Sequence, residues 1–489
     1  MRRDINRFRH AIAMVLAMSL PQAAFAFSSG STGADGAFNP TVNTQLQLPP
    51  DGIFNFTSVS IPTGVTVTFK KNTTNTPVVI LATGNVTITG TIDVSGTRAT
   101  DVGAAGDGNL GDDGVPGLGG PGGYDGGRGG TAGTTPGNGG NGLGPGGGGS
   151  GPFGPNFNCA GNGQPVGGGG AGFGDVGGAT VGQGTGGGVA YGTSQLLPLI
   201  GGSGGGGGSG WTGFSGSGGG GGGGAILIAA SGTLNITGAI QANGNASGVS
   251  SGQNSGATGG GGSGGGIRLL ATTISGNGTL NAVGSGANGS TVSFCYNGGS
   301  GSFGRIRLEA EAITRTAASN PVFPQVTAPT TVFIAGLPTL RITSVAGVSA
   351  PAAPTGNADI TLPSTTSNPV TVTFATTGVP VGNTVKLTVV PAAAAAVSVV
   401  SPALSGTTDS ATASVSVSLP GGPSVLQATT TYTIVASLGN ALSQFAMGER
   451  VEKITLSATL NGPSMITLTT ISGKQYTIPA KVAAGILAG

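Results

Sequence analysis

The chain has 489 residues, 103 of them glycine, and only 7% of its residues are charged. Its formal net charge of +2 is too small and too dispersed for a basic nucleic-acid-binding surface, so no nucleic acid partner is expected. The one histidine, His10, lies among the first 26 residues; without them the chain has no imidazole, which excludes Ser-His-Asp and Cys-His catalysis and histidine-ligated zinc or haem.

Residues 1–26 have the three parts of a secretory signal peptide. Four arginines form a basic beginning, an apolar run over 11–20 is too short to span a bilayer, and Ala24-Phe25-Ala26 is an A-x-A cleavage site. Cleavage there would make Phe27 the first residue and change 18 basic and 16 acidic residues to 14 and 15, a net charge of −1. No later apolar run reaches about 18 residues, so no transmembrane segment is predicted. The sequence therefore predicts an exported protein, extracellular or at the cell surface.

Residues 27–50, rich in Ser, Thr, Asn and Pro, are predicted to be a loose leader. Over 51–96 apolar and polar residues alternate, β-branched residues are frequent, and turns such as Pro62-Thr63-Gly64 interrupt the runs, which is typical of short strands. We expect this block to be the N-terminal part of a β-solenoid. Its predicted core consists of Phe54, Phe56, Ile61, Val65, Val67, Phe69, Ile80, Val86, Ile88, Ile92 and Val94.

Residues 97–223 form a glycine-rich insert with too few apolar side chains to bury a core. Over 108–131 glycine recurs at every third residue, a period typical of polyproline-II-type geometry. Three structures fit this pattern: a mobile loop, a polyglycine-II-like pleat packed against the solenoid, and a trimeric collagen-like stalk. Collagen needs far more proline and many more triplets. The sequence favours the loop over the pleat, and the pleat over collagen.

Two large side chains, Trp211 and Phe214, lie near the end of the insert. They could pack the insert onto the repeat that follows, or stay exposed as platforms on which sugars stack. Packing is the simpler prediction, because buried aromatic side chains contribute more apolar area than most residues.

Residues 224–319 contain a repeated phrase: AILIAASGTLNITGAIQANG from Ala225, GIRLLATTISGNGTLNAVGSG from Gly266 and the shorter RIRLEAEAIT from Arg305. A related copy, VVILATGNVTITGTIDVSG, begins at Val78. The last three copies begin about 40 residues apart, a spacing expected of stacked units. One unit cannot cover its own apolar face, so the copies must stack, and parallel stacking predicts a right-handed β-helix. Aligned by their apolar residues, the copies match Ile226, Ile228, Leu234, Ile236 and Ile240 with Ile267, Leu269, Ile274, Leu280 and Val283, in that order.

The composition changes again after a linker rich in Pro, Thr and Ala, which is predicted over 320–338. Over 339–442, alternating strands recur at about 8–15-residue spacing, which is typical of an immunoglobulin-like β-sandwich. This segment lacks the Trp and the paired Cys of antibody domains, so the prediction concerns architecture only. Residues 443–489 are expected to form a small C-terminal β unit.

Clustered carboxylates on one face of a β-helix would indicate a polysaccharide lyase or hydrolase. Asp93 lies in the TIDVSG turn of the first copy and Asp101, Asp107, Asp112 and Asp113 follow in the insert, whereas residues 176–308 contain neither Asp nor Glu. An enzyme of this kind is expected to place acids on several successive repeats. No catalytic residue is therefore predicted, and the acids are interpreted as solvated loop residues.

A calcium site is a second hypothesis. Asp107, Asp112 and Asp113 lie in the segment DGNLGDDG, and carboxylate and amide oxygens suit Ca²⁺. Their spacing matches neither the EF-hand loop nor the calcium-binding nonapeptide repeat. Soluble loop acids are the alternative, and no other cofactor is predicted.

Two cysteines, Cys159 and Cys295, are candidates for a disulfide, because an exported chain meets oxidising conditions. The bond would close a loop of roughly 136 residues and stabilise the fold by about 5 kcal/mol in the chain-entropy description. Two unpaired thiols are the alternative.

Threonine pairs around Val67 and Ile88 resemble the TxT rows of ice-binding solenoids. A flat ice-binding face needs many aligned rows, and the later repeats do not continue them. The β-propensity of threonine accounts for the pairs equally well, so ice binding stays an alternative.

The phrases GGGGGGAILIAASGTLNITGAIQANG and SGGGIRLLATTISGNGTLNAVGSG resemble the repeats of exported glycine-rich bacterial β-helix proteins, a class with pectin-lyase-like solenoids. The resemblance covers about 78–96 and 225–315. It implies a role as an adhesin or envelope component, often with Ig-like modules after the solenoid. No catalytic signature accompanies it, so no functional residue carries over.

The sequence as a whole predicts an all-β protein: a short parallel β-solenoid with a large glycine-rich insert, followed by an Ig-like β-sandwich. The expected role is structural or adhesin-like and non-enzymatic, with binding of surface or extracellular glycans, or self-association. A polysaccharide-active β-helix enzyme is the main alternative.

Overall fold

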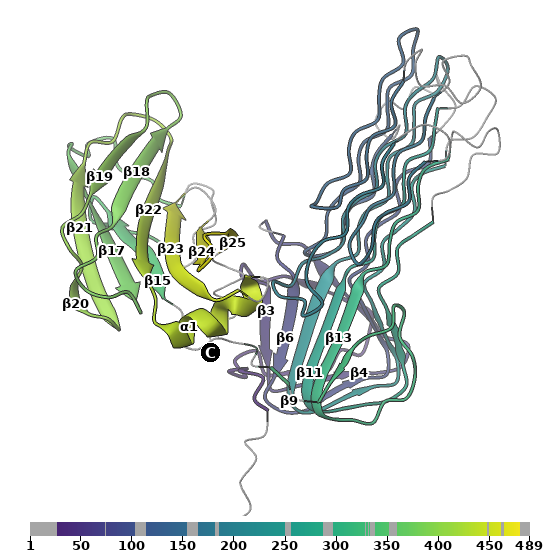
Figure 1. Cartoon of the computed structure of the whole chain (residues 1–489), viewed down its shortest axis with the longest axis horizontal. Helices are drawn as coiled ribbons and strands as arrows, with labels where there is room; N and C mark the ends of the chain where they lie inside the picture. The colour runs from purple at the N-terminus through teal and green to yellow at the C-terminus, as the bar shows by residue number, and fades with distance from the viewer. Residues whose placement is uncertain are drawn as a thin grey trace, which may run out of the picture.

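A computed structural model describes most of the chain after the first 26 residues (Figure 1). The described residues are 27–73, 75–102, 114–153, 165–180, 185–249, 256–286, 297–327, 329–330, 332, 338–351, 359–446, 449–460 and 464–479. Over them the chain is nearly all β, as predicted; the helical elements are α1 (Ala436–Ala441) and the 3-10 turn η2 (Leu442–Phe445). Within these residues no helix is long and apolar enough to cross a membrane.

The N-terminal part consists of two sheets whose strands all pair in parallel. The nine-stranded sheet contains β1 (Ala37–Phe38), β3 (Ile53–Phe56), β4 (Ser58–Ile61), β6 (Val78–Ala82), β7 (Val86–Ile88), β9 (Ala225–Ile236), β11 (Gly266–Ser275), β13 (Arg305–Ile313) and β14 (Gln325–Val326). The five-stranded sheet contains β2 (Thr44–Gln47), β5 (Thr66–Lys70), β8 (Thr91–Asp93), β10 (Ala239–Gln241) and β12 (Thr279–Asn281).

Each copy of the repeated phrase pairs with the next copy, residue by residue. Ile226 lies opposite Ile267, which lies opposite Ile306. Two predicted matches are wrong: Leu280 pairs with Ile240 and not with Ile236, so Ile240 does not pair with Val283. The register shifts between Ala271 and Thr273, because the second copy is one residue shorter there, and the copies re-align after the shift.

The space between the two parallel sheets is filled by Ile, Leu, Val and Phe side chains from every copy. Ten of the eleven predicted core residues in the first block are buried; Phe54 is half-buried and stacks on Phe56 with ring centroids 5.6 Å apart. Alternation of apolar and polar residues puts the apolar ones on the inner face of each sheet, since side chains of a strand alternate between faces.

The glycine-rich segments form a bundle of extended chains that continue from the parallel strands (Figure 1). The segment 201–210 illustrates the packing, because all its residues are buried and its backbone bonds to six neighbouring segments. It donates to 137–143, 166–174 and 216–224, it accepts from 146–151 and 257–266, and with 122–131 it donates once, from Gly201 to Gly122, and otherwise accepts. Each neighbour is met at every third residue, which is the period of a polyproline-II helix. We call this assembly the glycine bundle.

The interpretation of the insert as a mobile loop is therefore wrong for its described residues, and the pleat is the better description. The bundle also recruits the glycine-rich turns between repeats, among them 257–266 and 298–304. The segments are ordered although they lack apolar side chains, because their backbone N–H and C=O groups bond to one another. Glycine carries only a hydrogen atom as its side chain, so the backbones can approach closely.

The C-terminal part consists of two antiparallel sheets that share one apolar cluster. The first contains β15 (Thr339–Val345), β16 (Val348–Ser349), β17 (Val370–Thr377), β20 (Ser405–Thr407) and β21 (Ser410–Val417). The second contains β18 (Lys386–Pro391), β19 (Val397–Val400), β22 (Ser424–Thr433), β23 (Val451–Leu460), β24 (Met465–Thr470) and β25 (Gln475–Pro479). Because β22 pairs with β23, the strands predicted as a separate unit over 443–489 continue the second sheet.

Candidate functional site

The outer face of the five-stranded parallel sheet carries a column of polar side chains, one from each strand. Consecutive backbone partners place these residues in one line: Gln45, Thr68, Asp93, Gln241 and Asn281. They alternate along their strands with buried residues such as Ile92 and Ile240, so their side chains point away from the core. All five are half-buried or exposed. We call this column the polar ladder; apart from Asp93 it offers neutral hydrogen-bonding groups.

A second column beside the polar ladder consists of Thr66, Thr91, Ala239 and Thr279. Of the threonine motif Thr87–Thr91, only Thr91 joins this column; Thr87 lies on β7 in the other sheet, where it pairs with Ser60 and Asn235. The two TxT motifs therefore lie on different sheets and do not form one array.

The carboxylates considered for catalysis are dispersed. Asp93 accepts a hydrogen bond from the backbone N–H of Ser95 at 2.8 Å. Asp101 pairs with Arg98 and accepts from the N–H of Val249 at 2.7 Å. Eight residues of extended bundle chain separate the two acids, about 25 Å at the polyproline-II rise. The structure does not bring Asp93 and Asp101 together.

Several predicted site residues lie outside the described residues: Asp107, Asp112, Asp113, Cys159 and Cys295. The calcium site and the disulfide therefore stay predictions. Within the part of the chain that the structure covers, no group of three or more His, Cys, Asp or Glu residues could hold a metal ion.

The turn at 210–216 carries the aromatic residues of the insert to the far end of the glycine bundle. The segment 216–224 runs from this turn back to the first residue of β9, about 28 Å away at the polyproline-II rise. Trp211 packs edge-on against Phe153, with ring centroids 5.7 Å apart, and both rings are half-buried. The prediction that Trp211 seals the insert onto the next repeat is wrong, because the turn points away from that repeat.

A buried ionic cluster lies on the outer face of the nine-stranded sheet. Arg268 on β11 is 1% exposed and its Nε lies 3.1 Å from Oε1 of Glu309 on β13, which is fully buried. Arg307 donates to the same oxygen at 2.6 Å, and the backbone N–H of Thr330 donates to Oε2 at 2.9 Å. The cluster ties the chain around Thr330 to the sheet.

The electrostatics of the cluster favour the charged form of its carboxyl. Burial by itself would raise the pKa of Glu309, but the charge of Arg268, the hydrogen bonds from Thr330 and the hydrogen bond from Arg307 together hold it below its ordinary value. Burial lowers the pKa of Arg268, and Glu309 opposes that effect. Since these groups bond to one another, the cluster is a structural clamp and not a reactive site.

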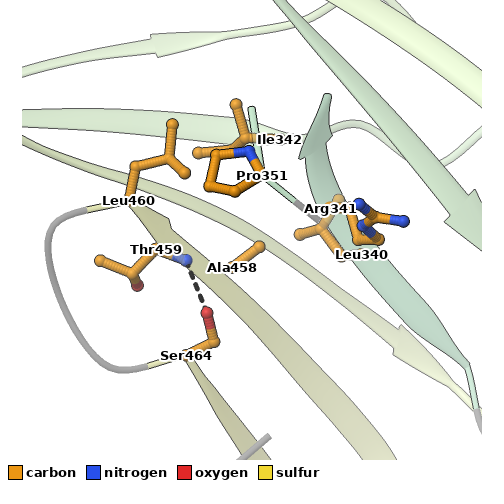
Figure 2. Close-up of a pocket in the computed structure, with 8 residues that line it drawn as sticks. All are labelled: Leu340, Arg341, Ile342, Pro351, Ala458, Thr459, Leu460 and Ser464. Atoms are coloured by element: carbon orange, nitrogen blue, oxygen red, sulfur yellow. Dashed lines mark hydrogen bonds between the residues drawn. The ribbon is translucent and has the colours of Figure 1, made fainter. Parts of the chain in front are cut away.

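A small hollow lies between β15 and β23 in the C-terminal part (Figure 2). It is lined by Leu340, Arg341, Ile342, Pro351, Ala458, Thr459, Leu460 and Ser464. Figure 2 shows the hydrogen bond from the backbone N–H of Thr459 to Ser464, at 2.9 Å. Arg341 is the one charged residue of this lining, so the hollow supplies no acid–base pair.

A comparison with family models, curated proteins and solved structures finds no match to this chain. The surfaces described above are therefore interpreted from their own geometry.

Proposed function

We propose that the chain is an exported structural or adhesin-like protein that binds neutral glycans. In this proposal the two parallel sheets form a short β-solenoid, the glycine bundle projects from it, and an Ig-like β-sandwich follows. Pairing of each copy of the phrase with the next supports the solenoid, and the shared core of two antiparallel sheets supports the sandwich.

The observation that carries the proposal is the glycine bundle with its aromatic turn. Three of its segments are enclosed by hydrogen-bonded neighbours: 201–210, 216–224 and 257–266. A backbone lattice of this kind is stiff, and it holds the turn at 210–216 far from the sheets. Presenting a few side chains at a distance from the body of the protein is what an adhesive surface requires.

The chemistry of the presented residues favours sugars as ligands. The Trp211–Phe153 pair offers an aromatic surface on which the apolar face of a sugar ring can stack, and the indole N–H can bond to a hydroxyl. The polar ladder offers amide and hydroxyl groups at the roughly 4.8 Å spacing of neighbouring strands. Both surfaces suit an uncharged polysaccharide better than a charged one.

A polysaccharide lyase or hydrolase is the alternative function. Asp93, in the middle of the polar ladder, is the residue on which cleavage would depend. Its substitution by asparagine keeps the size and removes the carboxylate, so Asp93→Asn separates binding from cleavage.

The Trp211→Ala variant is expected to bind insoluble neutral polysaccharides at least about tenfold more weakly than the parent chain, because removal of a central aromatic contact typically costs about 1.4 kcal/mol or more. Binding is measured by depletion of protein from solution over a panel of polysaccharides, with released reducing or unsaturated ends scored in the same tubes.

Phe303→Ala is the matched control, because Phe303 is 51% exposed but precedes β13 at the near end of the bundle. We expect it to bind as the parent does. Equal binding by all three proteins would contradict the aromatic turn as the binding surface. Product release that Asp93→Asn abolishes would contradict the structural role and establish the enzyme.

A further inference from the structure

The first described residues, Phe27–Thr32, run across several strands of the nine-stranded sheet. The N–H of Ser29 donates to Ser231 on β9 at 3.0 Å, and its hydroxyl donates to the carbonyl of Ala82 on β6 at 2.7 Å. The hydroxyl of Ser31 donates to the carbonyl of Phe56 on β3 at 2.8 Å. We call this segment the N-terminal strap.

The strap is anchored from its first residue. The side chain of Phe27 is 9% exposed and belongs to the apolar cluster that covers the outer face of the sheet. The other members of this cluster come from distant parts of the chain and include Leu81, Leu196, Leu227, Leu270 and Val332. An aromatic side chain placed this way fixes the position of its own backbone nitrogen.

That nitrogen faces a carboxylate. The N of Phe27 lies 2.9 Å from Oε1 of Glu311 at the end of β13. Glu311 forms no ion pair with a basic side chain within the described residues, since Arg307 and Arg268 bond to Glu309 and Arg315 donates to backbone carbonyls. On β9 the nearest partner of the strap is the uncharged Ser231.

Phe27 is also the residue that the A-x-A motif predicts to become the first of the processed chain. Hydrolysis of the Ala26–Phe27 peptide bond adds the hydroxyl of water to the carbonyl carbon of Ala26 and a proton to the nitrogen of Phe27. The new carboxyl group of Ala26 releases a proton and the amine takes one up, so a neutral amide with one hydrogen becomes an α-ammonium, with an ordinary pKa of about 7.7–8.0. The charge therefore arises at the atom that already lies within hydrogen-bond distance of Glu311.

We infer that the Ala26–Phe27 bond is a processing site whose new amine forms an ion pair with Glu311 and fastens the N-terminal strap. The inference rests on the export included in the proposed function, but it does not depend on any glycan. The ion pair can form only in the processed chain, so removal of residues 1–26 adds it to the hydrogen bonds that already hold the strap on the sheet.

The test begins with N-terminal sequencing of the protein secreted by a bacterial host, which we expect to begin at Phe27. The amine is then titrated by NMR. An ion pair raises its pKa, and we expect at least about a threefold gain in proton affinity, half a pKa unit above the ordinary value. The stabilisation is present below the ordinary amine pKa and is lost as the pH rises through the raised one.

Two variants make the result specific. Glu311→Gln keeps the hydrogen-bond acceptor but removes the charge, so it should return the pKa of the Phe27 amine to about 8. Glu452→Gln, at an exposed position of β23, is the control and should leave this pKa raised. A chain that begins at Ala26 should exchange the strap amides with solvent faster below pH 8. Cleavage elsewhere, or an amine insensitive to Glu311→Gln, would overturn the inference while leaving glycan binding unaffected.

Discussion

Replacing Gly206 with alanine is expected to destabilise the glycine bundle by about 3 kcal/mol or more, at the upper end of overpacking costs. Gly206 lies in the central segment, where an added Cβ would stand 1.9 Å from the carbonyl oxygen of Gly149. The three nearest atoms belong to backbone that is itself hydrogen-bonded: the carbonyl of Gly149 accepts from Gly169 at 2.8 Å and that of Gly148 accepts from Gly142 at 2.9 Å. No side chain can turn aside, so the segments must separate. Hydrogen exchange of the bundle amides and denaturant unfolding measure the effect.

Gly186→Ala is the matched control. Gly186 is also a bundle residue, with its carbonyl accepting from Gly149, but a Cβ there meets nothing within 4 Å. We expect this variant to be unchanged or slightly more stable, since alanine restricts the unfolded chain by about 0.4–1 kcal/mol. Similar exchange rates in the two variants would contradict the close backbone packing.

Glu309→Ala is expected to lower the free energy of unfolding by about 3–5 kcal/mol, because it leaves the buried guanidinium of Arg268 without a countercharge. Chemical denaturation followed by circular dichroism measures the loss. Glu452→Ala removes an exposed glutamate from β23 and should change stability by less than about 0.5 kcal/mol. Equal effects of the two substitutions would show that the cluster is not a clamp.

Equivalent positions of neighbouring repeats show which residues could replace the buried ionic cluster without that loss of stability. Leu227 occupies on β9 the position of Arg268 on β11, and Leu270 on β11 that of Glu309 on β13. The double variant Arg268→Leu/Glu309→Leu copies these neighbours and should recover the part of the stability lost by leaving Arg268 unpaired, since apolar replacement of a buried ion pair is often neutral; Arg307, 11% exposed, still loses its partner. A double variant as unstable as Glu309→Ala would contradict this.

The parent chain and the double leucine variant are also expected to differ in how their stability depends on pH. The pKa of Glu309 is lowered in the folded state, so its contribution is present above the unfolded pKa of about 4.3 and is lost as the pH falls through the folded value. The parent chain should therefore lose more stability than the double leucine variant between about pH 5 and pH 2. Parallel curves over this interval would contradict the charged cluster.

The parallel strands could be predicted because their information lies in side chains. Ile226, Ile267 and Ile306 recur at one position of the repeat, and stacking them is the one way to bury all three. Glycines leave no mark in a pattern of apolar residues. Gly276 lies against the backbone of Ile236, so an alignment of apolar residues passes over this glycine and matches both Ile236 and Ile240 wrongly.

The glycine bundle could be anticipated only as one of three alternatives. Its period of three is visible over 108–131, but the partners of each segment are not, because glycines carry no mark that distinguishes one neighbour from another. The hydrogen-bond lattice around 201–210 depends on which turns bring the segments together.

Of the candidate sites, the polar ladder and the N-terminal strap were missed by sequence reasoning. The sequence draws attention to Asp93 through its carboxylate. That Thr68 and Gln241 lie beside Asp93 follows only from the pairing of their strands, which the sequence does not show. The buried ionic cluster could have been predicted in part. Arg268 interrupts the apolar run GIRLLA, and a charged side chain inside a buried strand requires a partner.

The hydrogen-bond lattice around 201–210 also limits the changes in length that the glycine bundle can accommodate. Each neighbour is contacted once per three residues, so three residues added to each arm of a hairpin restore every contact and extend the arm by about 9 Å. One or two added residues would rotate the carbonyls toward the wrong neighbours. The projection can therefore grow or shrink only in steps of one turn.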